Sequence, residues 1–176
     1  MIQKIVDVKS SVLREKAKEV SKIDKKILAL IKDMKDTLKI QKDPEGVGLA
    51  APQIGKSYRI FVIDYKKFKR VIINPKIIKI SKVKKLNSET KKKDILEGCL
   101  SLPHYYGPIK RASKIEIEYM NERGEKQTEK FEGFDAQIIQ HEMDHLNGIL
   151  FIDKILEQKA PLYKFHGDEW EEVDII

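Results

Sequence analysis

The sequence predicts an α+β fold in which antiparallel strands pack around one late helix. Three observations support this prediction: an amphipathic helical pattern near the N-terminus, several strand-like segments after it, and a second helical segment beyond them. Helices and strands that are grouped rather than alternating are typical of α+β proteins. The chain has 176 residues and no proline- or glycine-rich linker, so we expect a single domain over residues 1–176.

The N-terminal amphipathic helix is predicted over residues 24–40. Asp24 is a suitable N-cap, because its short carboxylate can accept hydrogen bonds from the first free backbone N–H groups of a helix. Apolar residues then recur at helical spacing, at Ile27, Leu30, Ile31, Met34 and Leu38. We expect this apolar face to pack on the core.

The middle of the chain reads as strands, which we predict at residues 58–64, 71–80, 114–120 and 126–132. The third of these, "KIEIEYM", alternates polar and apolar residues as a half-buried strand does. Asn74-Pro75 interrupts the second, because proline cannot donate a ladder hydrogen bond. The lysine-rich residues 82–93 are predicted to form a mobile loop.

A second helix is predicted over about residues 136–147. Asp135 is its expected N-cap, and Phe134 is expected to pack on Ile139 as a hydrophobic staple. Gly148 is well placed to end the helix, because glycine readily adopts the left-handed backbone conformation found there.

This helix carries His141-Glu142-x-x-His145. Histidines at positions i and i+4 lie one turn apart on one face, so both can bind one metal ion while Glu142 reaches a metal-bound water. The ion would lower the pKa of that water, and the glutamate would take its proton. Only three positions of the pattern are fixed, so a chance match on an ordinary helix is the alternative.

A third ligand would strengthen the metal interpretation, and the chain offers four candidates. Glu157, His166 and Glu169 lie downstream of the motif, and Cys99 lies upstream. Cys99 is the lone cysteine, so it cannot form an internal disulfide; it is a metal ligand, a nucleophile or a small buried apolar residue. As a thiolate it would be a strong ligand.

The stretch "GVGLAAPQIG" (46–55) consists mostly of small residues. Small residues allow a backbone to approach a ligand or another strand closely. The amide of Gln53 could donate to a substrate oxygen there, or it could be bound to backbone in a structural turn. The spacing is not that of a phosphate-binding loop.

Composition limits the classes of protein. A hydrophobic fraction of 41% argues against a disordered chain, and no apolar run approaches the length of a membrane span. The N-terminus lacks the apolar core of a signal peptide, so we expect a soluble cytoplasmic protein. The net charge of +7 favours weak contact with nucleic acid or anionic surfaces, but solvated surface lysines are the stronger explanation of it.

Taken in order, "GVGLAAPQ", "EGCLS" and "QHEMDHLNG" closely resemble the three signature motifs of the peptide deformylase family. The resemblance spans roughly residues 46–151. It implies an enzyme that removes the formyl group from the N-terminal formyl-methionine of newly synthesised polypeptides. It also implies one divalent metal ion per chain, usually Fe²⁺, for which Zn²⁺, Ni²⁺ or Co²⁺ can substitute.

The resemblance also implies roles for individual residues. The metal ligands are Cys99, His141 and His145, with water at the fourth position, and Glu142 is the general base. The side-chain amide of Gln53 and the backbone N–H of Leu100 donate to the oxyanion. The backbone of Gly48 binds the peptide. The methionine pocket is expected to be lined by Val47, Ile95, Phe134 and Ile138, which would otherwise be plain core residues.

The chain departs from the family pattern at two places. Tyr106 stands where many bacterial members have an arginine, so the arginine's contact with the peptide beyond methionine is lost or replaced. The loop over residues 81–96 looks longer than in many relatives. Arg111 is retained and is expected to pair with Glu97. We read His104 and His166 as surface residues.

Two other functions are compatible with parts of the sequence. One is a generic HExxH metallopeptidase that uses His166 or Glu169 as its third ligand, and the other is a basic ribosome- or RNA-associated binding protein. Neither explains all three motifs. The expected partners are therefore N-formyl-methionyl nascent peptides, with the ribosome surface as a candidate docking site, and neither a membrane nor a specific nucleic acid.

Overall fold

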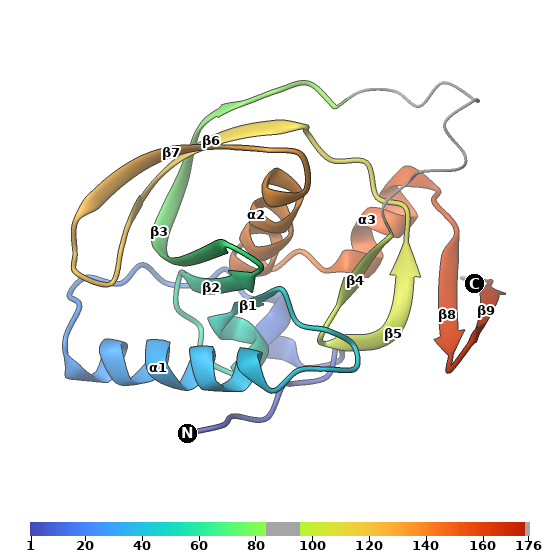
Figure 1. Cartoon of the computed structure of the whole chain (residues 1–176), viewed down its shortest axis with the longest axis horizontal. Coiled ribbons are helices and arrows are strands. Elements are labelled where there is room, and N and C mark those ends of the chain that lie inside the picture. Colours follow the sequence, from blue (N-terminus) through green and yellow to red (C-terminus); the bar gives the residue numbers. More distant parts are fainter. Residues whose placement is uncertain (84–95, 175–176) are drawn as a thin grey trace.

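The computed structural model describes residues 1–83 and 96–174 and has an α+β fold with two antiparallel sheets (Figure 1). The helical elements are η1 (Ser11–Arg14), α1 (Lys25–Lys39), η2 (Ala51–Ile54), α2 (Gly133–Leu146) and α3 (Phe151–Gln158). The five-stranded sheet has the order β1 (Gly48–Ala50), β2 (Ile60–Tyr65), β3 (Phe68–Ile80), β6 (Lys114–Met120) and β7 (Lys126–Glu132). The four-stranded sheet has the order β4 (Glu97–Cys99), β5 (Leu102–Gly107), β8 (Leu162–His166) and β9 (Glu169–Val173).

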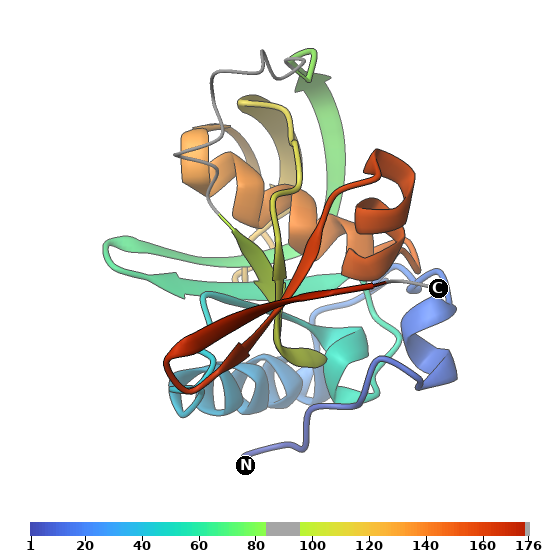
Figure 2. The same cartoon turned by 90° about the vertical axis from the view of Figure 1, so that its right-hand side faces the viewer.

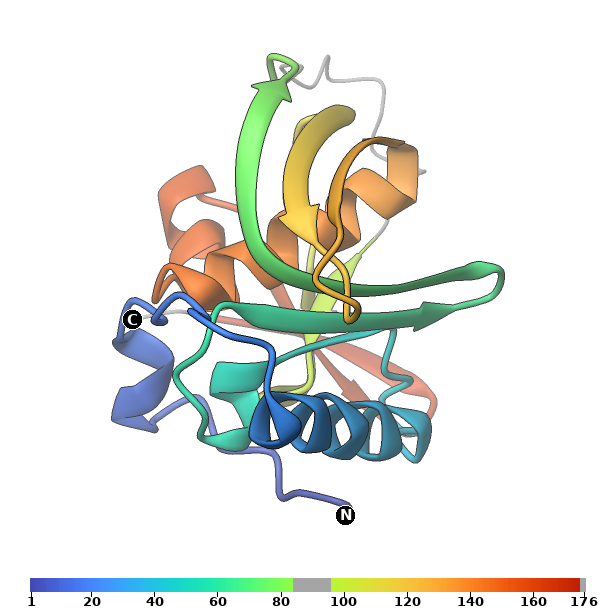
Figure 3. The same cartoon turned by 90° about the vertical axis from the view of Figure 1, so that its left-hand side faces the viewer.

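The five-stranded sheet lies between α1 and α2, which cover its two faces (Figure 3). The first four residues of strand β2, residues 60–63, are all apolar because both faces of this part of the strand are buried. Ile60 and Val62 belong to the cluster of buried residues that includes the face of α1, whereas Phe61 and Ile63 belong to the cluster around α2. A strand buried on both faces needs apolar residues at every position.

Helix α1 matches the N-terminal helix predicted from the sequence. The side chain of Asp24 accepts hydrogen bonds from the backbone N–H groups of Lys26 and Ile27, which confirms it as the N-cap. The predicted apolar face is buried at Ile27, Ile31, Met34 and Leu38. Leu30, the fifth residue of that pattern, is only partly buried.

The predicted interruption of β3 is a bulge that bends the strand. Asn74 has a φ of 52°, and the pairing of β3 with β6 shifts between Ile73 and Lys76. The Asn74 side chain holds this bend by bonding both the N–H and the C=O of Val20. Beyond the bulge, β3 curves with β6 and β7 around α2 (Figure 1).

The predicted start of α2 is wrong by three residues, although its end agrees with the prediction. The helix begins at Gly133, whose φ of 58° lets β7 turn directly into the helix without a loop. Asp135 therefore lies in the first turn and is not the N-cap. Phe134 packs edge-on against Tyr65 and against the buried cluster that includes Ile139. Gly148 follows the last turn with a φ of 73°.

The four-stranded sheet and α3 were not predicted from the sequence. They share a small apolar core, formed by Cys99, Ile109, Phe151, Ile155 and Leu162. The predicted mobile loop lies mostly outside the described residues, as does Ile95. Within the described ranges, no helix combines the length and the apolar character that crossing a membrane requires.

Candidate metal centre and active site

Cys99, His141 and His145 converge where the two sheets meet. Cys99 ends β4 of the four-stranded sheet, whereas both histidines project from α2, which packs on the five-stranded sheet. The distance between Cys99 Sγ and His145 Nε2 is 3.3 Å, and the two Nε2 atoms are 3.2 Å apart. The three ligand atoms all lie within 4.8 Å of one another, and all three residues are buried.

This donor set fits a tetrahedral metal site. With metal–nitrogen bonds of about 2.0–2.1 Å and a metal–sulfur bond of about 2.3 Å, ligand atoms lie roughly 3.3–3.6 Å apart. The measured separations are close to these values. In the described part of the chain, Cys99, His141 and His145 form the group of side chains that lie close enough together to bind one ion. The downstream candidates Glu157, His166 and Glu169 are not part of this group.

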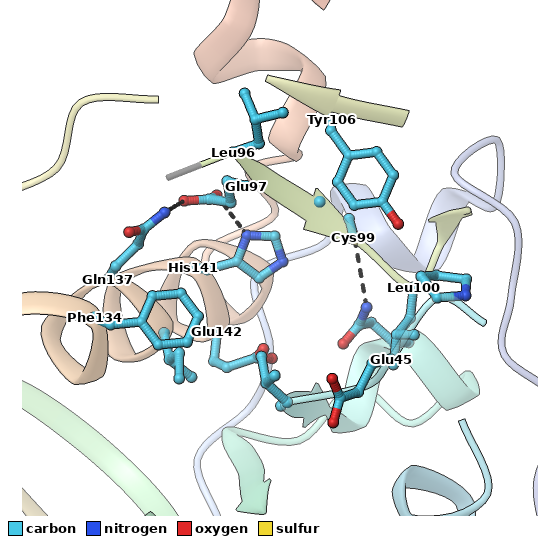
Figure 4. A pocket seen from close by; sticks show the side chains of 16 residues that line it. Glu45, Leu96, Glu97, Cys99, Leu100, Tyr106, Phe134, Gln137, His141 and Glu142 are labelled. Atoms are coloured by element: carbon cyan, nitrogen blue, oxygen red, sulfur yellow. Dashed lines mark hydrogen bonds and ion pairs between the residues drawn. The ribbon is translucent and has the colours of Figure 1, made fainter. Parts of the chain in front are cut away.

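The ligands are oriented by a buried ion pair. Glu97 Oε1 lies 2.7 Å from His141 Nδ1, which leaves Nε2 of that ring free to face the cluster. Arg111 donates to both oxygens of Glu97 at 2.7 and 2.6 Å and to Asp144 at 2.8 Å. The predicted pairing of Arg111 with Glu97 is thereby confirmed. The contact between Glu97 and His141 ties β4 to α2 (Figure 4).

The same contacts set the charges of the site. Burial alone would raise the pKa of Glu97, but hydrogen bonds from Arg111 and the charge of His141 hold it well below its usual range. Burial would also raise the pKa of the Cys99 thiol, yet the neighbouring histidines lower it to about 5. A thiol that ionises readily is suited to binding a cation.

Glu142 lies beside the cluster in an apolar setting. The residue is 3% exposed, and among the described residues its Oε2 atom has no hydrogen-bond partner. Burial raises the pKa of Glu142 to about 7. Gly48 faces it from β1, and a Cβ at position 48 would collide with the carboxylate, so a larger residue there would displace the Glu142 side chain.

Gln53 is held with its amide directed at the cluster. Its Oε1 accepts from the backbone N–H of Ala50 at 2.9 Å, which fixes the orientation of the amide. Its Nε2 lies 3.6 Å from Cys99 Sγ and 3.4 Å from Ser101 Oγ. The residue is thus bound to backbone, as one reading of the sequence suggested, and still offers donors to the site.

A cavity of about 240 Å³ opens onto Cys99, His141, Glu142 and Gln53 (Figure 4). Its wall includes the predicted residues Val47, Gly48, Leu100, Phe134 and Ile138, whereas the structure does not describe Ile95. The sequence analysis missed five further lining residues, Pro44, Glu45, Leu96, Gly98 and Gln137. Gln137 could have been found, because it lies one helical turn before His141 on the same face.

Comparison with known proteins decides the family. A sequence profile described as "Polypeptide deformylase" matches residues 2–161. The chain belongs to the polypeptide deformylase family. The peptide deformylase of Halothermothrix orenii is 48% identical over 88% of this chain and 92% of its own length, and that of Pseudothermotoga lettingae is 44% identical over 88% and 84%.

Solved deformylase structures agree with the fold. The crystal structure of peptide deformylase from Thermus thermophilus is 38% identical with a TM-score of 0.77, and covers 90% of this chain and 88% of that one. The deformylase of Synechococcus elongatus in complex with actinonin is 37% identical with a TM-score of 0.76, over 86% and 78%. The family predicted from the three motifs is therefore confirmed.

Proposed function

We propose that residues 1–176 form one catalytic domain that removes the formyl group from the N-terminal formyl-methionine of newly synthesised polypeptides and releases formate. The observation that carries this proposal is the convergence of Cys99, His141 and His145 beside a buried glutamate, in a cavity of a deformylase-family fold. The scissile bond is a linear amide at the start of the peptide, not a bond between two residues.

Cys99, His141 and His145 would hold one divalent ion, with Fe²⁺ as the expected ion and Zn²⁺, Ni²⁺ or Co²⁺ as substitutes. When bound, such an ion acts as a Lewis acid that polarises the formyl carbonyl and makes a coordinated water easier to deprotonate. Three protein ligands leave the open position that a catalytic site needs.

Glu142 is the proposed general base and then the general acid. It takes a proton from the attacking water, whose oxygen forms a bond to the formyl carbon. When the carbon–nitrogen bond breaks, Glu142 returns the proton to the departing amine, which leaves formate and a free N-terminus. A pKa of about 7 suits both steps, because proton transfer is most efficient when the group's pKa lies near the working pH.

The negative charge that develops on the formyl oxygen needs preorganised donors. We assign the Gln53 side-chain amide and the Leu100 backbone N–H to this role. The anchoring of Gln53 by Ala50 supports the assignment, because an amide that is already oriented need not reorganise during the reaction. The backbone of Gly48 is assigned to binding the peptide main chain.

The methionine side chain would occupy the apolar part of the cavity. Val47, Phe134 and Ile138 line the cavity, and Ile95 is kept in this proposal from the sequence. Burial of such a side chain contributes roughly 1.5–3 kcal/mol. If that energy is realised in the transition state, formyl-Met peptides should exceed formyl-Gly peptides by about ten- to a hundredfold in kcat/KM.

The proposal extends to the setting of the enzyme. Its substrates are nascent chains, so we place it in the cytoplasm, with the ribosome surface as a candidate docking site and no membrane or specific nucleic acid as partner. The net charge of +7 favours contact with an anionic ribosomal surface.

Formate release from formyl-Met-Ala-Ser, measured with Fe²⁺ under anaerobic conditions or with Ni²⁺, tests the proposed reaction. We expect metal-dependent release of formate and intact Met-Ala-Ser. Cleavage of an internal peptide bond would favour a generic metallopeptidase instead. Absence of both reactions in metal-loaded protein would refute the proposal and favour a binding protein.

A further inference from the structure

One face of the four-stranded sheet is aromatic. In the strand pairing, Gly98 of β4 lies opposite Tyr106 of β5, and Tyr106 lies opposite Tyr163 of β8. Directly paired residues share a face, and so do residues two apart along a strand. Phe165 of β8 and its partner Trp170 of β9 therefore lie on the same face as Tyr106.

We call Tyr106, Tyr163, Phe165 and Trp170 the aromatic face. The opposite face of the sheet packs on α3, because Leu162 and Val173 join a cluster with Phe151 and Ile155. No such buried cluster covers the aromatic face in the described residues, and Trp170 is 51% exposed. Rings that gather at a surface mark binding sites more often than chance, because each costs free energy when it is left in water.

The aromatic face is continuous with the cavity of the candidate active site. The Tyr106 ring lines the cavity and packs on Gly98, where an added Cβ would lie 2.7 Å from it (Figure 4). The Trp170 ring lies 5.4 Å from the Tyr106 ring and 4.8 Å from that of Phe165, on the β8–β9 hairpin that faces the viewer in Figure 2. From β4 to β9 there are three strand spacings, about 14 Å in all, which about four extended residues span.

The charges beside the cavity and the aromatic face favour the binding of a positively charged side chain. Glu45 is exposed and lines the cavity, and the described lining residues include no lysine or arginine. Asp43 adds to this negative potential: burial, together with the charge of Asp43, raises the pKa of Tyr106. Glu172 pairs with Tyr163 and therefore shares the aromatic face. Ring faces and nearby carboxylates together attract lysine and arginine side chains.

We propose that the aromatic face binds the residues that follow formyl-methionine in the nascent peptide, and that it favours lysine or arginine at about the third to fifth positions. Tyr106 and Trp170 supply the ring faces, and Glu45 supplies the carboxylate at the mouth of the cavity. The inference rests on the proposed deformylase function, which it deepens by naming a substrate preference. At position 106, many bacterial members of the family have an arginine, whose charged group attracts anions. Here the tyrosine ring contributes instead to a surface that attracts cations.

A kinetic comparison tests this preference in the metal-loaded enzyme. The substrates are formyl-Met-Ala-Lys-Lys-Ala and formyl-Met-Ala-Glu-Glu-Ala, with formyl-Met-Ala as the reference within each variant because it is too short to reach Trp170. We expect the lysine peptide to exceed the glutamate peptide in kcat/KM by about three- to tenfold, from one cation–π contact and one exposed ion pair. Trp170→Ala and Glu45→Gln should each lower this ratio.

Two variants control for indirect effects. Trp170→Phe keeps a ring and should retain part of the preference. Tyr58→Ala removes an aromatic residue that is 39% exposed and does not line the cavity, and it should leave the lysine-to-glutamate ratio unchanged. The inference would be overturned if wild type and Trp170→Ala had the same lysine-to-glutamate ratio of kcat/KM. It would also be overturned if the only effect of Trp170→Ala were a change in oligomeric state.

Fluorescence gives a readout that does not depend on turnover, because Trp170 is the only tryptophan in the chain. In a Glu142→Ala background, the lysine pentapeptide should change the emission of Trp170, and formyl-Met-Ala should not. If no formyl-peptide releases formate, the proposed function itself fails. If formyl-Met-Ala is deformylated but the pentapeptide gives neither a rate advantage nor an emission change, only the present inference fails.

Discussion

The five-stranded and four-stranded sheets meet at the candidate site, but they are built differently. The five-stranded sheet is covered on both faces by large apolar clusters that include α1 and α2. The four-stranded sheet has one small apolar cluster, and its strand β4 is only three residues long. Its contact with α2 depends on polar groups, chiefly Glu97, Arg111 and His141.

The site is therefore assembled from two differently stabilised parts. Helix α2, which packs on the larger sheet through apolar residues, supplies His141, His145 and Glu142, whereas the smaller sheet supplies Cys99. The polar contacts that position Cys99 are therefore also the contacts that hold the smaller sheet in place. Changes on the two sides should separate chemistry from stability, and four variants test this in order of decreasing effect.

Glu142→Ala should strongly lower the catalytic activity without disturbing the contact between the sheets. The substitution removes the proposed base but no metal ligand, so kcat for formyl-Met-Ala-Ser should fall by about two to four orders of magnitude. Metal content and thermal unfolding, measured on the same sample, should stay close to wild type. Near-normal activity would mean that the base lies elsewhere.

Arg111→Met should destabilise the contact between the two sheets. Its side chain is 7% exposed and that of Glu97 is 6% exposed, so the change leaves a buried carboxylate without its partner. Such a loss typically costs about 3–5 kcal/mol of unfolding free energy. Arg70→Met is the matched control, because Arg70 also binds both oxygens of a glutamate, Glu129, but at the surface of the larger sheet.

Chemical denaturation of both arginine variants measures the contrast. An Arg111→Met cost no larger than that of Arg70→Met would show that the smaller sheet does not depend on its buried ion pair. The account predicts instead that Arg111→Met also weakens metal binding, because Glu97 orients His141.

Gln53→Leu tests a side chain that crosses from one sheet to the other. Gln53 follows β1 of the larger sheet and reaches Cys99 of the smaller one. Loss of one oxyanion donor typically lowers kcat about 100- to 1,000-fold. Steady-state kinetics with formyl-Met-Ala-Ser decide the role: a large rise in KM with unchanged kcat would make Gln53 a substrate anchor.

The smallest effect concerns the pH dependence of the surface pair. Hydrogen bonds from Arg70 lower the pKa of Glu129 in the folded protein, so the pair stabilises the fold above the unfolded-state pKa of about 4.3. That contribution is lost as the pH falls through the lower, folded-state pKa. We expect wild type to exceed Arg70→Met by at most about 1 kcal/mol at pH 7. The difference should shrink toward zero in denaturation series carried below about pH 4.

The two sheets also differ in how far the sequence predicts them. Strands such as 114–120 and helix α1 carry a clear period over seven or more residues, and the structure has both. Strand β4 is too short to show any period, and the pairing of Tyr106 with Tyr163 joins segments far apart in the chain. Neither the smaller sheet nor its aromatic face could be inferred from local pattern.

The residues of the candidate site also differ in how far the sequence predicts them. The three motifs name the residues that converge, because motif residues are recognisable without knowledge of the fold. Geometry that depends on packing is not encoded locally: Leu96 and Glu45 line the cavity only because the chain brings them there. The predicted start of α2 is wrong because Gly133, with its positive φ, allows a turn that no capping pattern in the sequence indicates.

Metal content tests the central claim most directly, because the claim is that one ion joins a ligand of the smaller sheet to two ligands of α2. Wild type, Cys99→Ala and His166→Ala would be purified under anaerobic conditions, and bound metal would be measured by elemental analysis. The account predicts close to one ion per chain in wild type and in His166→Ala, and loss of metal in Cys99→Ala. Full occupancy in Cys99→Ala, or loss of metal in His166→Ala, would contradict it.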